Sequence, residues 1–340
     1  MNARLQLAYV GMHPARRADL VDRMGSADAV LASIRKGTVE VPDHARLAAG
    51  VPAAIRLEQL REDGLAVALR EEMPDHLSEL PDCPDLLFVR GSLPSVPGVA
   101  VVGSRRATAY GMRMANAYGR ALAKAGWPVV SGLARGVDGS AHRGVVEADG
   151  CGIAVLGSGP DIWYPKEHRA IGEQLVAAGG AVVTEYPPGT PPNGWRFPPR
   201  NRIISGFSLV VVVVEAARTG GALITARTAL SQGREVFAVP GDIDRPTSEG
   251  CNLLIRDGAV PVFDSDDLIE AASIVLGPPK QRPMGNDGDE ILRLIGPIGR
   301  SIDALAEDLS KPAASVLADV ARLEAHGLVR RSGGLISRDR

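Results

Sequence analysis

The sequence lacks several features that would define its class at once. Its three cysteines, Cys83, Cys151 and Cys251, are far apart and show no CxxC spacing, so we expect neither disulfides nor a zinc site. No Gly-Lys dipeptide occurs, which excludes a Walker-type phosphate loop. The most apolar run, Leu209–Val214, is far too short to cross a bilayer, and Met1–Leu7 lacks the apolar segment of a signal peptide. These absences predict a soluble cytoplasmic protein without a metal or other cofactor.

Lysine is also scarce, because only five of the 38 cationic residues are lysines. The net charge of -2 argues against a generally basic coat for nucleic acid. A nucleic-acid site would therefore have to be a local patch. Arginine, which supplies the other cations, suits bidentate recognition of phosphate.

The pattern of apolar and polar residues changes at about residue 64. Residues 1–63 show helical periodicity interrupted by Gly25, Gly37 and Gly50, which predicts a bundle of short helices. From there to residue 277, apolar runs alternate with helical stretches, a pattern typical of a mostly parallel α/β sheet. We expect the first two strands to extend one side of it. The nine predicted strands are Leu65–Leu69, Leu86–Val89, Val99–Val102, Val129–Val130, Ile153–Leu156, Ala181–Val183, Leu209–Val214, Val236–Val239 and Val260–Phe263.

The C-terminal part has a different pattern. Residues 278–288 are rich in proline and glycine and predict a linker. In residues 289–340, three short helices precede a two-stranded ribbon that turns at Gly333-Gly334, as in a winged-helix domain. The helices are expected at Glu290–Ile295, Ile302–Leu309 and Ala314–His326. The third carries one cation and two carboxylates, a poor surface for phosphate, so a protein contact is at least as plausible as DNA recognition.

Glycine-containing turns follow two of the predicted strands. Gly103-Ser104-Arg105 ends one strand, and the turn from Ser131-Gly132 to Arg135-Gly136 ends the next. Glycine allows close backbone approach to a ligand, and the helix N-terminus behind the turn favours an anion. The two turns predict an arginine-lined anion site at the carboxyl edge of the sheet.

The segment from Phe197 to Gly206 combines an aromatic ring with Arg200, Asn201 and Arg202. One interpretation is a platform on which bases stack while guanidinium groups hold the backbone. The other is that Phe197 belongs to the core and the arginines bind carbonyl groups in a proline-rich loop. The residues alone leave both open.

Three more features have a functional and a structural interpretation. Gly220-Gly221 opens a helix and could present N–H groups to phosphate. Glu215 could hold a ribose hydroxyl, but a role in fixing the neighbouring loop is favoured. Asp138 and His142, four residues apart, could be an acid/base pair or two metal ligands; a helix-terminal carboxylate and a hydrogen-bonded histidine are favoured.

Together these motifs resemble the DNA-processing protein A family (DprA, also called Smf) from about Leu65 to Leu268. The resemblance rests on Val102–Arg105, Ser131–Asp138 with Ala141-His142, Ala154–Gly157, Thr184–Gly189, Phe197–Gly206, Leu223–Ala226 and Val239–Gly241. It implies an extended Rossmann-like, mostly parallel sheet, with a SAM-like helical domain before it and a DML1-like winged-helix domain after it.

The resemblance also implies a function. Such proteins are not enzymes: they bind single-stranded DNA without strong sequence preference, load a RecA-type recombinase in natural transformation and recombination, and form homodimers through the Rossmann domain. Where family members often carry lysine, this chain has Arg196 and Arg218, which could supply the missing charge. The predicted strand-binding residues are Gly103, Ser104, Arg105, Ser131, Gly132, Arg135, Gly136, Arg196, Phe197, Arg200, Asn201, Arg202, Arg218, Gly220 and Gly221.

Two alternatives belong to other classes. A Rossmann-like hydrolase related to nucleoside-monophosphate phosphoribohydrolases would need a glutamate one helical turn after its Gly-Gly turn, but Arg227 stands six residues after Gly221. A transcriptional regulator would use the winged helix, but its third helix has a single cation, Arg322, beside two carboxylates. We therefore favour the single-strand binder.

Overall fold

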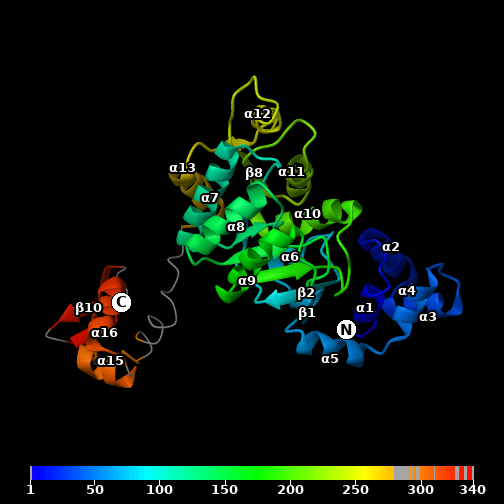
Figure 1. Ribbon diagram of the computed structural model, residues 1–340, viewed down its shortest axis with the longest axis horizontal. Helices are drawn as coiled ribbons and strands as arrows, with labels where there is room; N and C mark the ends of the chain where they lie inside the picture. The colour runs from blue at the N-terminus through cyan, green and yellow to red at the C-terminus, as the bar shows by residue number, and fades with distance from the viewer. Residues whose placement is uncertain are drawn as a thin grey trace. The chain divides into compact units, whose positions relative to one another are not determined.

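The computed structural model describes residues 2–278 and, further on, residues 291, 294–295, 299–309, 311–325, 329–332 and 335–338 (Figure 1). The chain forms two compact units, residues 1–280 and 281–340. Within the described residues, no helix has the length and apolarity needed to cross a membrane.

The first unit begins with five helices whose core is continuous with the edge of the sheet. Leu5 and Leu60, from two of these helices, pack in one cluster with Leu86 and Phe88 of a strand. The predicted boundary at residue 63 thus falls within one compact unit and remains a prediction about domain organisation. The helices are α1 (Asn2–Ala8), α2 (Pro14–Met24), α3 (Ala27–Lys36), α4 (Asp43–Gly50) and α5 (Ala53–Glu62).

A nine-stranded sheet follows, in the order β1-β2-β6-β5-β4-β3-β7-β8-β9. Strands β3 to β9 all run parallel to one another. At one edge, β2 pairs antiparallel with β6, and β1 pairs antiparallel with β2. Each predicted apolar run forms a strand, and the first two extend one side as expected. The strands are β1 (Ala66–Leu69), β2 (Leu86–Gly91), β3 (Gly98–Val102), β4 (Val129–Ser131), β5 (Gly152–Val155), β6 (Ala181–Thr184), β7 (Ser208–Val213), β8 (Glu235–Ala238) and β9 (Val260–Pro261).

Helices cover both faces of the sheet because alternate residues of the buried strands point to opposite sides. One face packs on α7 (Ala109–Lys124), α8 (Val137–Glu147), α9 (Arg169–Ala177) and α13 (Ser265–Leu276). The other packs on α6 (Asp75–Ser78), α10 (Phe197–Gly206), α11 (Gly221–Ser231) and α12 (Glu249–Arg256). Short 3-10 turns lie at η1 (Arg70–Glu72), η2 (Lys166–His168) and η3 (Gly194–Arg196).

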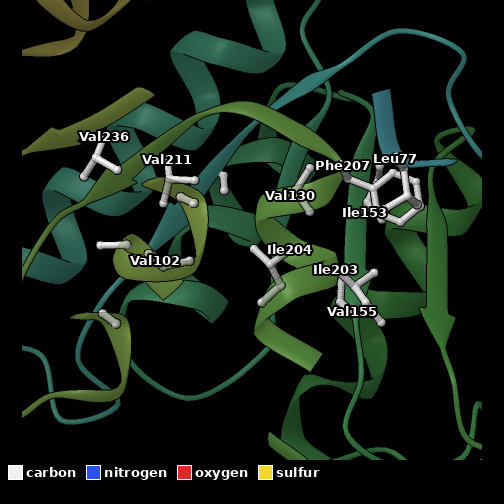
Figure 2. Close-up of a cluster of buried hydrophobic side chains, with 14 of the residues drawn as sticks. Leu77, Val102, Val130, Ile153, Val155, Ile203, Ile204, Phe207, Val211 and Val236 are labelled. Atoms are coloured by element: carbon white, nitrogen blue, oxygen red, sulfur yellow. The ribbon is translucent and has the colours of Figure 1, made fainter. Parts of the chain in front are cut away.

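Helix α10 corrects the interpretation of its segment as a proline-rich loop. Pro198 and Pro199 lie in the first helical turn, where a missing N–H costs no intrahelical hydrogen bond. The following turns bury Ile203, Ile204 and, just after the helix, Phe207 against Val130, Ile153 and Val155 of the sheet (Figure 2). This apolar packing fixes the orientation of α10, and its N-terminus carries Phe197.

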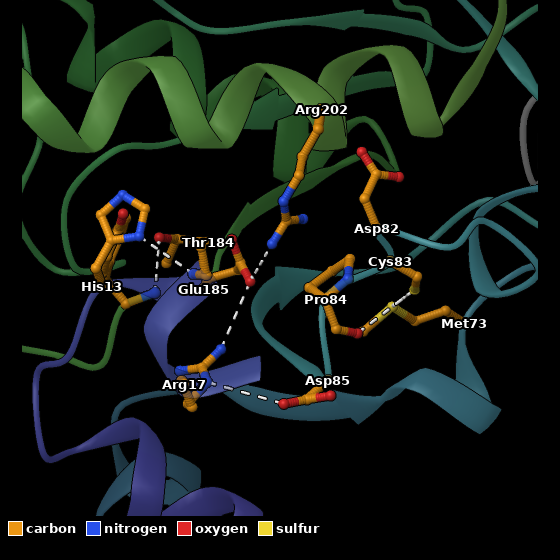
Figure 3. Close-up of polar contacts among 12 residues, drawn as sticks. His13, Arg17, Met73, Asp82, Cys83, Pro84, Asp85, Thr184, Glu185 and Arg202 are labelled. Carbon is orange, nitrogen blue, oxygen red and sulfur yellow. Dashed lines mark hydrogen bonds and ion pairs between the residues drawn. The ribbon is translucent and has the colours of Figure 1, made fainter. Parts of the chain in front are cut away.

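A buried carboxylate joins the helical region to the sheet. Glu185, 2% exposed, follows β6 and accepts a 2.6 Å hydrogen bond from Arg202 of α10 (Figure 3). Arg17 of α2 lies 3.5 Å from the same carboxylate and 3.9 Å from Asp85, which precedes β2. Arg202 and Arg17 compensate this charge, which would be strongly destabilising if it were buried without a partner. The network holds α2 and α10 against the end of β6.

The second unit has a winged-helix fold. The described parts are α15 (Ile302–Asp308), α16 (Ala313–Ala325) and the antiparallel pair β10 (Val329–Ser332) and β11 (Leu335–Arg338). Leu305, Val316, Val320 and Ile336 share a core of their own. Most of the predicted linker, part of the helix expected at 290–295 and the Gly333-Gly334 turn lie outside the described residues.

Candidate nucleic-acid interface

A pocket lies where the strand order reverses. From β3 the chain continues through β4, β5 and β6 on one side, and β7 to β9 lie on the other. The loops after β3 and β7 diverge at this point, the usual ligand-binding position in doubly wound sheets. Residues 103–106 of the first loop and Ala216, Ala217 and Gly220 of the second line a cavity of about 370 Å³. We call it the switch-point pocket.

Close packing, more than ligand approach, explains the glycines of the predicted turns. A Cβ on Gly103 would lie 2.9 Å from the Glu215 carbonyl oxygen, and one on Gly136, which has φ +76°, would overlap the Ser104 carbonyl. The Ser104 N–H donates to the Glu215 carbonyl at 2.7 Å, so it is not free for phosphate. These residues shape the pocket wall.

Ser131 is a correction to the predicted site. Its side chain is fully buried, and its hydroxyl donates a 2.7 Å hydrogen bond to the carbonyl of Val101 in the neighbouring strand. A strand of DNA therefore has no access to it. Glu215 has the structural role that we favoured: it accepts hydrogen bonds from the Thr108 N–H and, at 2.6 Å, the Thr108 hydroxyl, which holds the loop before α7.

An aromatic and cationic cluster forms one side of the pocket. Phe197 is half-buried and belongs to neither core cluster of the sheet. The Arg105 guanidinium lies 4.6 Å from its ring centroid, and the Tyr164 ring lies 5.5 Å away at an interplanar angle of 35°. A smaller cavity of about 150 Å³, lined by Arg135 and Tyr164, shares Arg105, Phe197 and neighbouring residues with the switch-point pocket.

Arg200 and Arg202 differ from the prediction. Arg200 is 4% exposed, and its Nη1 donates to the carbonyls of Gly132 and Val155, with Asn201 accepting from Nε. Burial lowers the Arg200 pKa to about 10, opposed by Asp138, so the side chain stays cationic at neutral pH. Arg202 is engaged by Glu185. Both arginines position α10, and neither is free to hold a phosphate.

The other predicted cations are distributed over the surface. Arg135 is exposed but paired with Glu167 at 2.7 Å, which raises the Arg135 pKa. Arg218 is exposed beside the Gly220-Gly221 turn, and those glycines, unlike Arg218, line the switch-point pocket. Arg196 stacks on Trp195 and lines a different cavity.

Asp138 and His142 do not form a catalytic pair. Asp138 is buried at the start of α8 and accepts a 3.1 Å hydrogen bond from the Gly132 N–H. Burial raises its pKa, against the nearby Arg200 charge. His142 is fully buried, and the loss of hydration lowers its pKa to about 3. It is therefore neutral at physiological pH and lies inside the α8 packing.

Comparison with known proteins identifies the family. The sequence model of the family DNA recombination-mediator protein A matches residues 65–273, and the sequence model of the DprA winged helix domain matches residues 277–334. The chain belongs to the DNA recombination-mediator protein A (DprA) family. Protein Smf of Escherichia coli is 39% identical over 272 residues, 76% of this chain and 73% of that protein. DNA processing protein DprA of Bacillus subtilis is 39% identical over 203 residues, 59% of this chain and 68% of that protein.

Two solved structures of the DprA family are similar to this one. DprA from Streptococcus pneumoniae gives a TM-score of 0.64 at 31% identity and covers 78% of this chain and 95% of its own. DprA from Helicobacter pylori, described for its single-stranded DNA binding mode, gives 0.55 at 28% identity, covering 61% of this chain and 95% of its own.

Our prediction from sequence did not include two residues that line these cavities, Arg106 and Tyr164. Arg106 lines both cavities and is exposed, and its place directly after Arg105 could have indicated it. Tyr164 comes from the loop after β5, 42% exposed, and contacts Phe197 across 33 residues of sequence. No local pattern marks Tyr164, because only the fold brings its loop to the N-terminus of α10.

Proposed function

We propose that this protein binds single-stranded DNA, without strong sequence preference, across the switch-point pocket. The observation that carries the proposal is the cluster of Phe197, Tyr164, Arg105 and Arg106 at the carboxyl edge of the sheet. Every base has a face that can stack on an aromatic ring, whereas only an unstacked base can reach such a ring. Exposed guanidinium groups beside the rings favour the phosphates between those bases.

The cations support an electrostatic contribution to binding. Arg105 and Arg106 are exposed, and no ion pair engages either of them within the described part of the chain. They are therefore available for phosphates, unlike Arg135, which must first leave Glu167. Because these neighbouring arginines make this edge of the sheet locally positive, the net charge of -2 for the whole chain does not prevent it from binding nucleic acid.

The remaining parts of the proposal come from the family resemblance. We place this chain among proteins that load a RecA-type recombinase onto single-stranded DNA in natural transformation, and we propose a homodimer formed through the Rossmann-like domain. The winged-helix unit would then contact protein or duplex DNA. The similarity to the Helicobacter pylori protein, whose structure is described for its single-stranded DNA binding mode, supports the choice of ligand.

We also propose that the protein is not an enzyme. Among the residues that line the switch-point pocket, Asp138 is the one carboxylate, and its oxygen is engaged by the Gly132 N–H. A phosphoribohydrolase would need a free acid after the Gly-Gly turn, where α11 carries the exposed Arg227. The pocket thus offers cations and rings for binding but lacks an available general acid or base.

Fluorescence anisotropy over a salt series tests the ligand. A mixed-sequence single strand should bind more tightly than the matching duplex and far more tightly than ATP, and log Kd should rise linearly with log salt. Each phosphate contact should contribute about 0.7 to the slope. If ATP bound as tightly as the oligonucleotide, the site would be a mononucleotide pocket and the hydrolase class would return.

A further inference from the structure

A second cavity lies between the helical region and the start of α10. It has a volume of about 390 Å³ and is lined from the α1–α2 connection, α2, the start of α4 and η3. We call it the Trp195 cavity. The side chains that matter for its chemistry are His13, Arg16, His44, Trp195 and Arg196. All of its lining residues lie within the described range 2–278, and none of them is a carboxylate.

The cavity combines an accessible aromatic surface with positive charge. Trp195 is 40% exposed, and the exposed His13 ring stacks with it at a centroid distance of 5.3 Å and an angle of 30°. The Arg196 guanidinium lies 4.7 Å from the Trp195 ring centroid, and its Nη1 donates to the backbone carbonyl of Pro191. Arg16, also exposed, projects from α2, and its Nη2 donates to the backbone carbonyl of Glu40. An aromatic stack with guanidinium groups beside it is suited to a nucleotide.

The cavity is adjacent to the proposed strand-binding site. Trp195 and Phe197 are separated by one residue, so their Cα atoms are no more than about 7 Å apart. They nevertheless face different cavities, Trp195 the second and Phe197 the switch-point pocket. A strand that stacks on Phe197 can therefore place a neighbouring nucleotide against Trp195.

The walls of the cavity are held in place by buried contacts. The Arg17–Glu185–Arg202 network fixes α2 against β6 and α10. From the protein side, Tyr186 meets Trp195 edge-on at 6.3 Å, and the Arg196 guanidinium lies 5.3 Å from the Tyr186 ring. Because the supporting contacts are buried and the Trp195 edge is exposed, the platform is preorganised for a ligand rather than built as core.

We propose that the Trp195 cavity is a second nucleotide subsite, in which a base extends the His13–Trp195 stack and Arg16 and Arg196 contact the adjoining phosphates. The inference rests on the proposed function, because it takes the same strand one step beyond Phe197. It assigns to the N-terminal helical region a direct part in binding single-stranded DNA.

Anisotropy with single strands of increasing length tests the subsite in the full chain. Trp195→Ala should weaken binding of a long mixed-base strand roughly 5- to 150-fold, the range for one stacked base. It should leave a strand too short to reach beyond Phe197 unaffected. Trp195→Tyr should restore most of the affinity. Phe263→Ala, which removes another exposed ring (63% exposed), is the matched control and should bind normally.

Arg16→Gln gives an independent readout with little risk to the fold, because Arg16 is exposed. It should lower the salt slope for the long strand by about 0.7. Wild-type affinity and slope in both Trp195→Ala and Arg16→Gln would overturn the subsite. If Phe197→Ala also bound like wild type, the proposed function would fail with it; a loss confined to Phe197→Ala would refute the subsite alone.

Discussion

The arginine side chains in and around the switch-point pocket differ in the groups that they already bind. Arg200 donates to two main-chain carbonyls, Arg202 and Arg135 are paired with carboxylates, and Arg105 lies exposed over the Phe197 ring. A guanidinium that is buried or paired must give up existing interactions before it can bind phosphate. The free charge at the site is therefore concentrated on Arg105 and Arg106.

Arg105→Ala should weaken single-strand binding equally for all sequences, because a phosphate contact carries no base information. The salt slope should fall by about 0.7, the value for one contact on a single strand. Arg169→Ala is the matched control, since Arg169 is exposed but paired with Glu173 at 2.8 Å on α9. Titration of both variants at four salt concentrations measures the slopes. An unchanged slope in Arg105→Ala would remove this residue from the site.

His142 makes a pH prediction, because its pKa is lowered to about 3 by burial. The unfolded chain binds this proton below about pH 6.5, whereas the folded chain resists it until near pH 3. The contribution of neutral His142 to the free energy of unfolding is therefore fully present above pH 6.5 and falls as the pH drops from 6.5 towards 3. From pH 7 to 5.5 the wild type should lose about 1 kcal/mol more than His142→Gln. Urea unfolding at both pH values measures this; equal losses would contradict it.

At the scale of single residues, the sequence indicated which side chains have suitable chemistry, but it did not indicate which of them are exposed to a ligand. Residue type and turn position were enough to propose Arg105 and Phe197, and the structure places both at the switch-point pocket. They could not separate Arg200 from Arg105, because the acceptors of Arg200 lie 68 and 45 residues away in the chain. For the same reason, Tyr164 was missed.

Among the secondary-structure elements, strands were predicted better than α10. Each buried strand is a run of apolar residues that occupies both faces of the sheet, so the pattern is strong even over four residues. In α10, two prolines and four polar residues obscure the helical period. The apolar residues that it buries in the core, Ile203 and Ile204, come near its end, and Phe207 follows it; they meet a core assembled from distant strands.

Helices α7 and α8 cross closely, and this gives a prediction about a glycine at their contact. A Cβ on Gly144 of α8 would overlap the Asn116 carbonyl of α7, a backbone atom that cannot rotate away. Gly144→Ala should therefore destabilise the protein by about 1–3 kcal/mol despite the better helix propensity of alanine. Gly50→Ala, at the end of α4 with no atom within 4 Å, should be neutral or stabilise by up to about 1 kcal/mol. Denaturant unfolding compares the two; equal stabilities would refute the close packing.

For the whole molecule, each compact unit has its own hydrophobic core. The proposed DNA site lies entirely within the first unit, on loops after β3, β5 and β7 and on α10. The second unit carries α16, whose sequence has one arginine and two carboxylates. The proposed binding surface therefore lies in residues 1–280, whereas the sequence alone left the winged helix as a competing module.

A shortened chain that ends at Leu276 should therefore remain folded and keep most of its affinity for single strands. Circular dichroism and anisotropy on the same sample test this. Loss of affinity in a shortened chain that is still folded would make the winged-helix unit the main binding module. Retained affinity would leave that unit for another partner.

The account depends most on Phe197 acting as a stacking platform. Phe197→Ala should weaken binding to a mixed-base strand about 5- to 150-fold, in line with roughly 1–3 kcal/mol per stacked base. An abasic strand should bind weakly to the wild type and lose little more on mutation, because it has no base to stack. The decisive measurement is affinity for both strands together with the melting temperature of the same preparation. The account predicts a normal melting temperature and a loss specific to the mixed-base strand. A mutant that melted early, as expected for a buried phenylalanine that costs about 3–5 kcal/mol, and still bound normally would contradict it.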